Sequence, residues 1–184
     1  MARNDPLLGY NFLVSLTDSQ PTLSSAIGSL IVAVAGAQAT AGFSEVSGLE
    51  ATMDIENYDA GGLNGGTLHF AGRVKWSNLV FSRGVLAQRD IGDTSDFWTW
   101  LQGFLDGQGV RKDGTISLLD ETQSPALVWG WSRGLPVRWT GATMNAQQSQ
   151  IAIERLEIAH EGLTLIQGGS SLASAIVGAV EAIF

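Results

Sequence analysis

The stretch LEATMDIENY, Leu49–Tyr58, alternates apolar and polar side chains along its whole length. One face carries Leu49, Ala51, Met53 and Ile55, and the other carries Glu50, Thr52, Asp54 and Glu56. A period of two is the pattern of a half-buried β-strand. The chain is therefore predicted to be mainly β.

A second strand signal follows in GRVKWSNLVFSRG, Gly72–Gly84. Val74 and Trp76 share one face, whereas Leu79 and Phe81 fall on the face of the preceding basic residues. Such a change of phase predicts a bulge or bend near Asn78.

The segment between these strands is the glycine-rich DAGGLNGGT, Asp59–Thr67. A phosphate-binding loop ends in G-K-[ST] and leads into a helix. Here Gly66 is followed by the strand-like Thr67–Phe70. The segment is predicted to be a mobile connection between two strands.

Further strands are predicted from similar patterns in 10–16, 115–119, 127–131, 136–139 and 150–166. The last run changes phase, because Ile151 and Ile153 point one way and Leu156 and Ile158 the other. A long strand of this kind is expected to be bulged or covered on both faces.

One helix is predicted in GDTSDFWTWLQGFLDGQG, 92–109. Asp93 or Ser95 would cap it, Asp96 would lie in its first turn and Gly107 would end it. Its apolar stripe is expected in the core and consists of Phe97, Trp98, Leu101, Phe104 and Leu105.

Composition limits the possible functions. The 184 residues predict one domain, and the absence of Cys excludes disulfides and thiolate metal sites. A net charge of −8 argues against nucleic acid as the main partner. The apolar runs Ala26–Ala37 and Leu172–Phe184 are too short to span a bilayer. With no signal-peptide pattern visible, we expect synthesis in the cytoplasm.

Motifs of catalysis are weak. His69 and His160 are the only histidines and lack zinc-site spacing, so no metal is expected. Neither Ser44 nor Ser47 stands in G-x-S-x-G. A carboxylate pair on the Leu49–Tyr58 strand is better interpreted as a solvated acidic face. We expect no catalytic site and no cofactor.

Five stretches together resemble the tail tube (inner tube) proteins of contractile phage tails and of phage-like extracellular contractile injection systems. They are YNFLVSL, AGFSEVSGLEATMDIENYDAGG, GRVKWSNLVFSRG, DFWTWLQGFLDG and PVRWTGATMNAQQSQIAIERLEIAHEGLTL. The resemblance covers about Asp5–Ile166, and its most specific parts are FSEVSGLE and IERLEIAHEGL.

The resemblance implies a β-barrel-like fold of two packed antiparallel sheets with one flanking helix. It further implies hexameric rings, stacked into a hollow tube inside a contractile sheath, with no enzymatic activity. Implied partners are other copies of the chain, the sheath, baseplate or spike and terminator proteins, and a protein or DNA cargo in the lumen. The chain would be a virion component or part of a phage-like particle.

In this family the region matching 49–83 supplies lumen-lining strands and a loop that touches neighbouring subunits. Thr52 and its acidic neighbours are candidates for the lumen face or for cross-strand pairing with Arg73 and Lys75. The full set of interface or lumen candidates is Glu50, Thr52, Asp54, Glu56, Tyr58, Gly61, Gly62, Leu63, Asn64, Gly65, Gly66, Arg73 and Lys75.

Two segments depart from the family pattern. About twenty extra residues occupy 18–38, within an expected tube domain of 1–167, and an apolar tail follows at 168–184. The tail is predicted to be a docking helix.

Two other functions remain open. One is a hexameric ring protein of a type VI secretion system, and the other is a small β-sandwich domain that binds or cleaves carbohydrate. Ligand-stacking Trp would be exposed, whereas Trp98, Trp100, Trp129 and Trp131 have core-like patterns.

Overall fold

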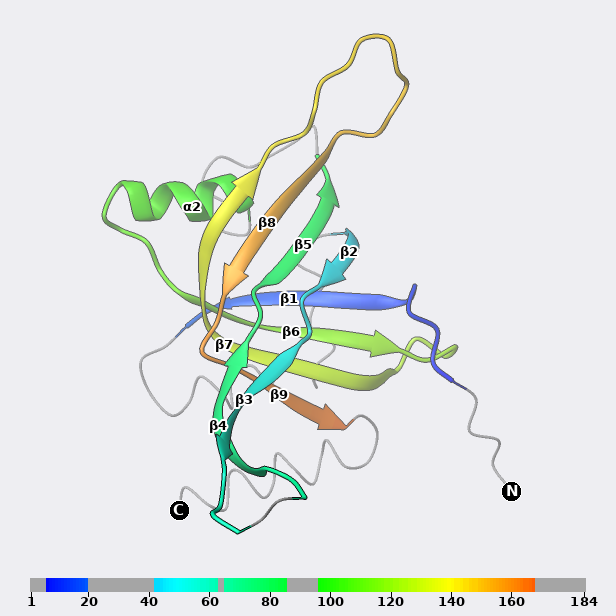
Figure 1. Cartoon of the computed structure of the whole chain (residues 1–184). Helices are drawn as coiled ribbons and strands as arrows, with labels where there is room; N and C mark the ends of the chain where they lie inside the picture. The colour runs from blue at the N-terminus through cyan, green and yellow to red at the C-terminus, as the bar shows by residue number, and fades with distance from the viewer. Residues whose placement is uncertain (1–5, 20–41, 63–64, 86–95, 168–184) are drawn as a thin grey trace, which may run out of the picture.

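The computed structural model describes residues 6–19, 42–62, 65–85 and 96–167 (Figure 1). Its elements are β1 (Phe12–Asp18), β2 (Phe43–Ser47), β3 (Ala51–Tyr58), β4 (Leu68–Trp76), β5 (Leu79–Gly84), α2 (Phe97–Leu105), β6 (Lys112–Leu119), β7 (Pro125–Thr140), β8 (Ile153–Ala159) and β9 (Gly162–Gln167). Residues 20–38 of the expected insertion and the tail at 168–184 lie outside the described residues.

Two antiparallel sheets share strand β7. Sheet A contains β1, β6, the first half of β7 and β9. Sheet B contains the second half of β7, then β8, β5 and β2. Figure 1 shows the strands of the two sheets running across one another. Two packed antiparallel sheets with a flanking helix are therefore confirmed, although neither sheet closes into a barrel within the described residues.

β7 is one strand of 16 residues where the sequence predicts two. Its early part pairs with β6 and β9, and its later part pairs with β8. Arg133 has a φ of 52° at the change of sheet. A Cβ on Gly134 would lie 2.8 Å from the carbonyl oxygen of Lys112, so only glycine fits there. This local distortion lets β7 turn from one sheet into the other.

The predicted long strand 150–166 is two strands, β8 in sheet B and β9 in sheet A. Within β8 the alternation is regular, because Glu154, Leu156 and Ile158 are all buried. The expected bulge or double covering of this run is therefore wrong. A buried carboxylate in a core position produces the break in the apolar pattern.

The core lies between the sheets and under α2. Sheet B contributes Leu79, Phe81, Leu156 and Ile158, sheet A contributes Val14, Ile116 and Trp131, and α2 contributes Phe97 and Trp100. The Phe81 and Trp131 rings are 5.4 Å apart between centroids, which joins the two sheets directly. Leu127, Trp129 and Trp131 share one face, as predicted, since they pair with alternate residues of β6.

α2 differs from the sequence prediction at its start and in its stripe. Asp96 is the N-cap, and its side chain accepts a hydrogen bond from the main-chain N–H of Thr99. Trp100 replaces Trp98 in the buried stripe, and the Trp98 side chain is 42% exposed. Leu105 is also exposed, so its predicted core position is wrong. Gly107 follows the helix with a φ of 74°, as predicted.

Strands β3 and β4 form a separate two-stranded sheet that extends from the body (Figure 1). Ser77 and Asn78 interrupt the strand between β4 and β5, which confirms the predicted bend. On the other arm, Gly48 has a φ of 90°, and a Cβ there would lie 2.0 Å from the carbonyl oxygen of Asn78. Both arms of the hairpin therefore leave sheet B through an irregular step.

Candidate assembly surfaces

The β3–β4 hairpin has an apolar face that is largely exposed in the described part of the chain. Cross-strand pairing places its residues opposite one another on that face. Met53 is 53% exposed and Ile55 is 62% exposed. We call this surface the apolar hairpin face; it consists of Ala51, Met53, Ile55, Ala71, Val74 and Trp76. The sequence predicts a half-buried strand with Met53 and Ile55 on its apolar face, whereas every residue of β3 is exposed in the single chain.

An exposed two-stranded sheet of this kind is marginally stable in water. Contiguous exposed apolar side chains of this extent mark interaction surfaces on soluble proteins. The periodicity of Leu49–Tyr58 is therefore that of a strand whose apolar face packs against another surface. No such surface is found among the described residues of this chain.

A β-bulge divides the hairpin. Two residues of β4, Gly72 and Arg73, stand opposite the single residue Asp54. The extra residue turns Leu68 and Phe70 to the face opposite Val74. There the Phe70 ring meets that of Tyr58 edge to face at 6.1 Å. The hairpin tip therefore has an aromatic pair on its otherwise polar face.

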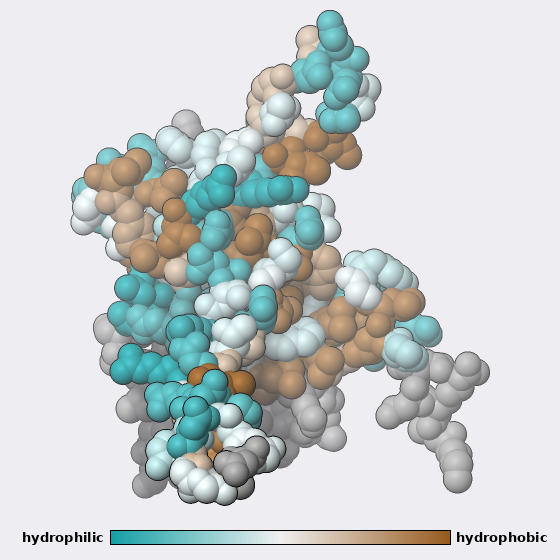
Figure 2. Space-filling model, in the orientation of Figure 1, coloured by the Kyte–Doolittle hydropathy of each residue, from teal (hydrophilic) through white to brown (hydrophobic). Residues whose placement is uncertain are grey.

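The polar hairpin face holds the charged candidates. Lys75 Nζ lies 2.7 Å from Asp54 Oδ2, and both side chains are more than half exposed. This confirms cross-strand pairing for Lys75, while Arg73 forms no ion pair with a described residue. Figure 2 shows mainly hydrophilic side chains on the hairpin surface turned to the viewer. Thr52 and Glu56 are exposed on the same face.

The glycine-rich loop connects these strands, as predicted. Thr67 Oγ1 donates to Asp59 Oδ1 at 2.9 Å, which ties the two ends of the loop together. Gly62 has a φ of 91°, a conformation that favours glycine. Gly61, Gly65 and Gly66 have open space where a Cβ would point. Leu63 and Asn64 lie outside the described residues.

The root of the hairpin is held by hydrogen bonds that the sequence does not predict. His160 Nε2 lies 3.1 Å from the carbonyl oxygen of Ser77, and its ring is 6.2 Å from that of Trp76. Asn78 Nδ2 donates to Glu157 Oε1 at 2.8 Å, and Glu50 Oε2 accepts from Ser77 Oγ at 3.3 Å. No local motif identifies such contacts, because the partners lie far apart in the sequence.

A buried ionic group holds α2 to sheet B. Arg83 donates from Nε to Glu154 Oε1 and from Nη2 to Asp96 Oδ1, each at 2.7 Å. Its guanidinium lies 4.1 Å from the centre of the Phe97 ring. Trp139 Nε1 donates to Glu154 Oε2 at 3.2 Å. The group joins a helix cap, the core and β8, so its role here is structural.

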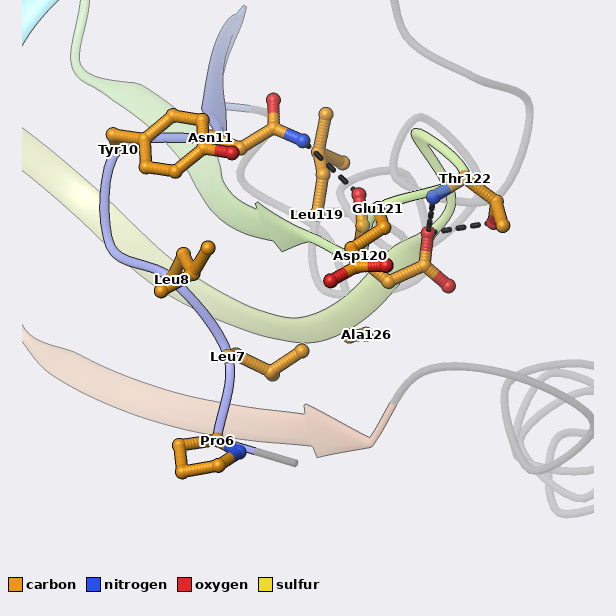
Figure 3. A pocket seen from close by; sticks show the side chains of 10 residues that line it. All are labelled: Pro6, Leu7, Leu8, Tyr10, Asn11, Leu119, Asp120, Glu121, Thr122 and Ala126. Carbon is orange, nitrogen blue, oxygen red and sulfur yellow. Dashed lines mark hydrogen bonds between the residues drawn. The ribbon is translucent and has the colours of Figure 1, made fainter. Parts of the chain in front are cut away.

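A hollow of about 490 Å³ lies at one end of sheet A, between the N-terminal segment and the β6–β7 turn (Figure 3). Asn11 Nδ2 donates to the Asp120 carbonyl oxygen at 3.0 Å. Asp120 Oδ1 accepts from the hydroxyl and N–H of Thr122 and from the N–H of Ser124. The hydroxyl bond from Thr122 is the main cause that lowers the pKa of Asp120. The carboxylate thus fixes the turn.

No cluster of metal-ligating side chains occurs among the described residues. Within the same part of the chain, no helix is both long and apolar enough to cross a bilayer. Of the four Trp expected in the core, Trp100 and Trp131 are buried, and Trp129 is partly buried. The exposed Trp98 packs on Trp139 at 4.9 Å between ring centres.

The family model of the T4-like virus tail tube protein gp19 matches residues 10–164. No curated protein matches the chain.

Several solved structures have the same fold. A chain of the anti-feeding prophage baseplate aligns with a TM-score of 0.69 at 24% identity, covering 90% of this chain and 98% of that one. A chain of the anti-feeding prophage tube-terminating cap aligns with a TM-score of 0.69 at 22% identity, and the alignment covers 91% of this chain and 95% of that one. A chain of the sheath–tube complex of the PVC extracellular contractile injection system aligns with a TM-score of 0.69 at 21% identity. The alignment covers 89% of this chain and 93% of that one.

Proposed function

Because the chain belongs to the T4-like virus tail tube protein gp19 family, we propose that it forms the inner tube of a contractile injection system or a contractile phage tail. Its copies form hexameric rings that stack into a hollow tube inside a sheath, and the lumen carries cargo. The protein is a conduit and performs no chemistry of its own. It is made in the cytoplasm and built there into a phage tail or phage-like particle.

The uncovered apolar hairpin face is the observation that carries this proposal. Met53, Ile55 and Val74 are each more than half exposed on a hairpin that has no second layer in the described chain. A two-stranded hairpin gains stability when its apolar face packs against another surface. A neighbouring copy in a ring supplies that surface at every position of a symmetric assembly.

The edges of sheet B support the same assembly. β2 and the later part of β7 are the outer strands of this sheet among the described residues. Exposed strand edges lead to uncontrolled association unless they are covered. Joining one copy to the next along these edges covers them, and a rotation that closes gives a ring.

The candidate residues divide between two roles in this tube. The apolar hairpin face and the glycine-rich loop contact the neighbouring subunit, together with Tyr58, the last residue of β3 before the loop. The polar hairpin face is in contact with water in the tube. It carries Thr52, Asp54, Glu56 and Lys75, and Arg73 lies at the bulge. The ends of the tube meet baseplate or spike and terminator proteins, and the outer wall meets the sheath. Glu50 closes the hairpin root through Ser77.

We also propose that residues 1–167 form the tube domain and that the tail at 168–184 docks on a neighbouring subunit or on the sheath. Deleting 168–184 is expected to reduce tube length, tube stability or sheath attachment. If all three are unchanged in the deletion variant, the tail has no docking role.

Negative-stain electron microscopy of the purified protein tests the proposed function. Wild type is expected to form six-fold rings or tubes. The I55D/V74D variant, which places charge on the apolar hairpin face, is expected to remain monomeric with an unchanged circular dichroism spectrum. Its matched control is E56Q, on the polar face. A uniform wild-type monomer at high concentration, together with glycan binding, would overturn the proposal.

A further inference from the structure

Sheet B has an outward face that is polar and uncovered by the described chain. In β8, Leu156 and Ile158 point into the core, and Arg155 and Glu157 alternate with them. The register places Arg138 and Val80 on either side of Glu157. The outward face of sheet B therefore carries charged side chains in the middle of the sheet.

Two of these side chains are cations without a fixed partner. Neither the Arg138 nor the Arg155 side chain forms an ion pair or hydrogen bond with any described residue. The nearby Glu157 is already held by Asn78. In contrast, five other cationic side chains are engaged in ion pairs: Lys75, Arg83, Arg111, Lys112 and Arg133.

The two arginines line one hollow. It has a volume of about 270 Å³ and is lined by Val80, Arg138, Thr140, Arg155 and Glu157. Two guanidinium groups and one carboxylate give it a local charge of about +1 on a chain whose net charge is −8. The hollow is thus a positive spot on an acidic protein.

The packing of the sheets indicates where this hollow lies in a tube. The inner face of sheet B is covered by sheet A and α2. The middle of the outer face of sheet A is already buried, since Thr115 is 2% exposed and Val128 is 0% exposed. If copies join along the edges of sheet B, the outward face of that sheet is free to line a water-filled bore, in addition to the polar hairpin face.

The chemistry of the hollow favours a carboxylate ligand on a protein. Arginine binds carboxylates through two parallel N–H donors. Thr140 adds a hydroxyl and Val80 an apolar contact. A nucleic acid needs a continuous track of cations along its phosphates. Here the carboxylate of Glu157 is a neighbour of both arginines, opposite Arg138 and two residues along β8 from Arg155. The chain as a whole is acidic, so a phosphate polymer fits less well.

On the basis of the proposed tube, we propose that Arg138 and Arg155 form a carboxylate-binding site on the bore wall that holds an acidic segment of a protein cargo. Each ring repeats the site around the bore. Several weak contacts to one cargo molecule then add up, and each remains weak enough to be released as the cargo moves.

Binding of labelled peptides to assembled tubes tests this site. Tubes are first checked by electron microscopy, and fluorescence anisotropy then measures a ten-residue oligoglutamate, an oligolysine of equal length and an oligothymidylate. Wild-type tubes are expected to bind oligoglutamate best. The Kd is expected to rise about tenfold or more in R138Q/R155Q and much less in R138K/R155K.

The matched control is R111Q/R133Q, which removes the same charge from a surface where both arginines pair with Glu161. Its Kd is expected to equal that of wild type. The single variants R138Q and R155Q are measured as well, so the site is tested even if the double variant does not assemble.

Three results would overturn the inference: equal weakening in both double variants, no weakening in either single variant, or tighter binding of oligothymidylate than of oligoglutamate. Failure of the proposed function is a separate result, because in that case the wild-type protein forms no rings or tubes at all.

Discussion

Gly72 of β4 lies against the main chain of Asp54 in β3, so that a Cβ on Gly72 would come within 2.8 Å of the Asp54 carbonyl oxygen. This contact is what the bulge requires, because a side chain at Gly72 would push the two strands apart. The bulge in turn sets which β4 side chains join the apolar hairpin face.

Gly72→Val is therefore expected to abolish rings while leaving the body folded. The hairpin is exposed along both strands, so its distortion removes few contacts from the core. Sedimentation velocity is expected to show monomer, with a thermal midpoint within about 2 °C of wild type. Gly162→Val is the control, because open space surrounds that position. Normal rings in Gly72→Val would show that the bulge geometry is not needed.

The glycine-rich loop gives a second prediction. Gly61, Gly65 and Gly66 have room for a side chain in the single chain, so valine at these positions is expected to leave the monomer unchanged. If the loop lies against a neighbouring subunit, the same substitutions impair assembly, as measured by tube yield in electron microscopy. Gly62 is left out because its φ of 91° would strain any larger residue. Normal tubes would reduce the loop to a tether.

The buried ionic group predicts that Arg83→Ala lowers the free energy of unfolding much more than Lys75→Ala. Arg83→Ala removes the cation that contacts Glu154 and Asp96 in the core, and such losses cost about 3–5 kcal/mol. Lys75→Ala removes an exposed pair worth less than about 1 kcal/mol. Denaturant unfolding measures both. Equal small losses would mean that the Arg83 group does not hold α2 in place.

The Asp120 turn predicts a dependence on acid. Its pKa is lowered by the hydrogen bonds from Thr122 and Ser124, so the stability it contributes is complete above its ordinary value of 3.8. That contribution is lost as the pH falls through the lower, folded-state pKa. The stability difference between wild type and D120A is expected to be constant near neutrality and to shrink below about pH 4.

Carboxyl NMR titration provides the direct value. A pKa of Asp120 at or above 3.8 would contradict the hydrogen-bonded turn. E121A is the control for the acid series, because the Glu121 side chain lies in the same turn and is exposed.

The strands could be predicted from the sequence wherever one apolar face meets one polar face, as in Leu49–Tyr58. The alternation of apolar and polar residues does not predict the buried side chain of Glu154, because a charged residue is expected on the surface. Its partner Arg83 lies 71 residues away, so the sequence gives no local sign of the pair. The sequence predicts two strands, 127–131 and 136–139, where the chain forms the single strand β7, because the segment 132–135 has no strand pattern of its own.

The site was harder to predict than the fold. The alternation indicates that Met53 and Ile55 pack against an apolar surface, but it does not show whether the same chain or another copy supplies that surface. In α2, Trp98 and Trp100 both fit an apolar stripe, and only the position of sheet B decides that Trp100 is the buried one. The hairpin root at His160 depends on contacts between distant segments, so sequence spacing alone could not reveal it.

In the proposed tube a neighbouring copy covers the apolar hairpin face. Because the chain has no Cys, M53C and E56C each introduce one thiol, on opposite faces of β3. Reaction with a small maleimide is measured on dissociated monomers and on assembled tubes. The M53C thiol is expected to react readily in monomers and at least about tenfold more slowly in tubes, whereas the E56C thiol is expected to react at the same rate in both. Equal rates for M53C in the two states would contradict it.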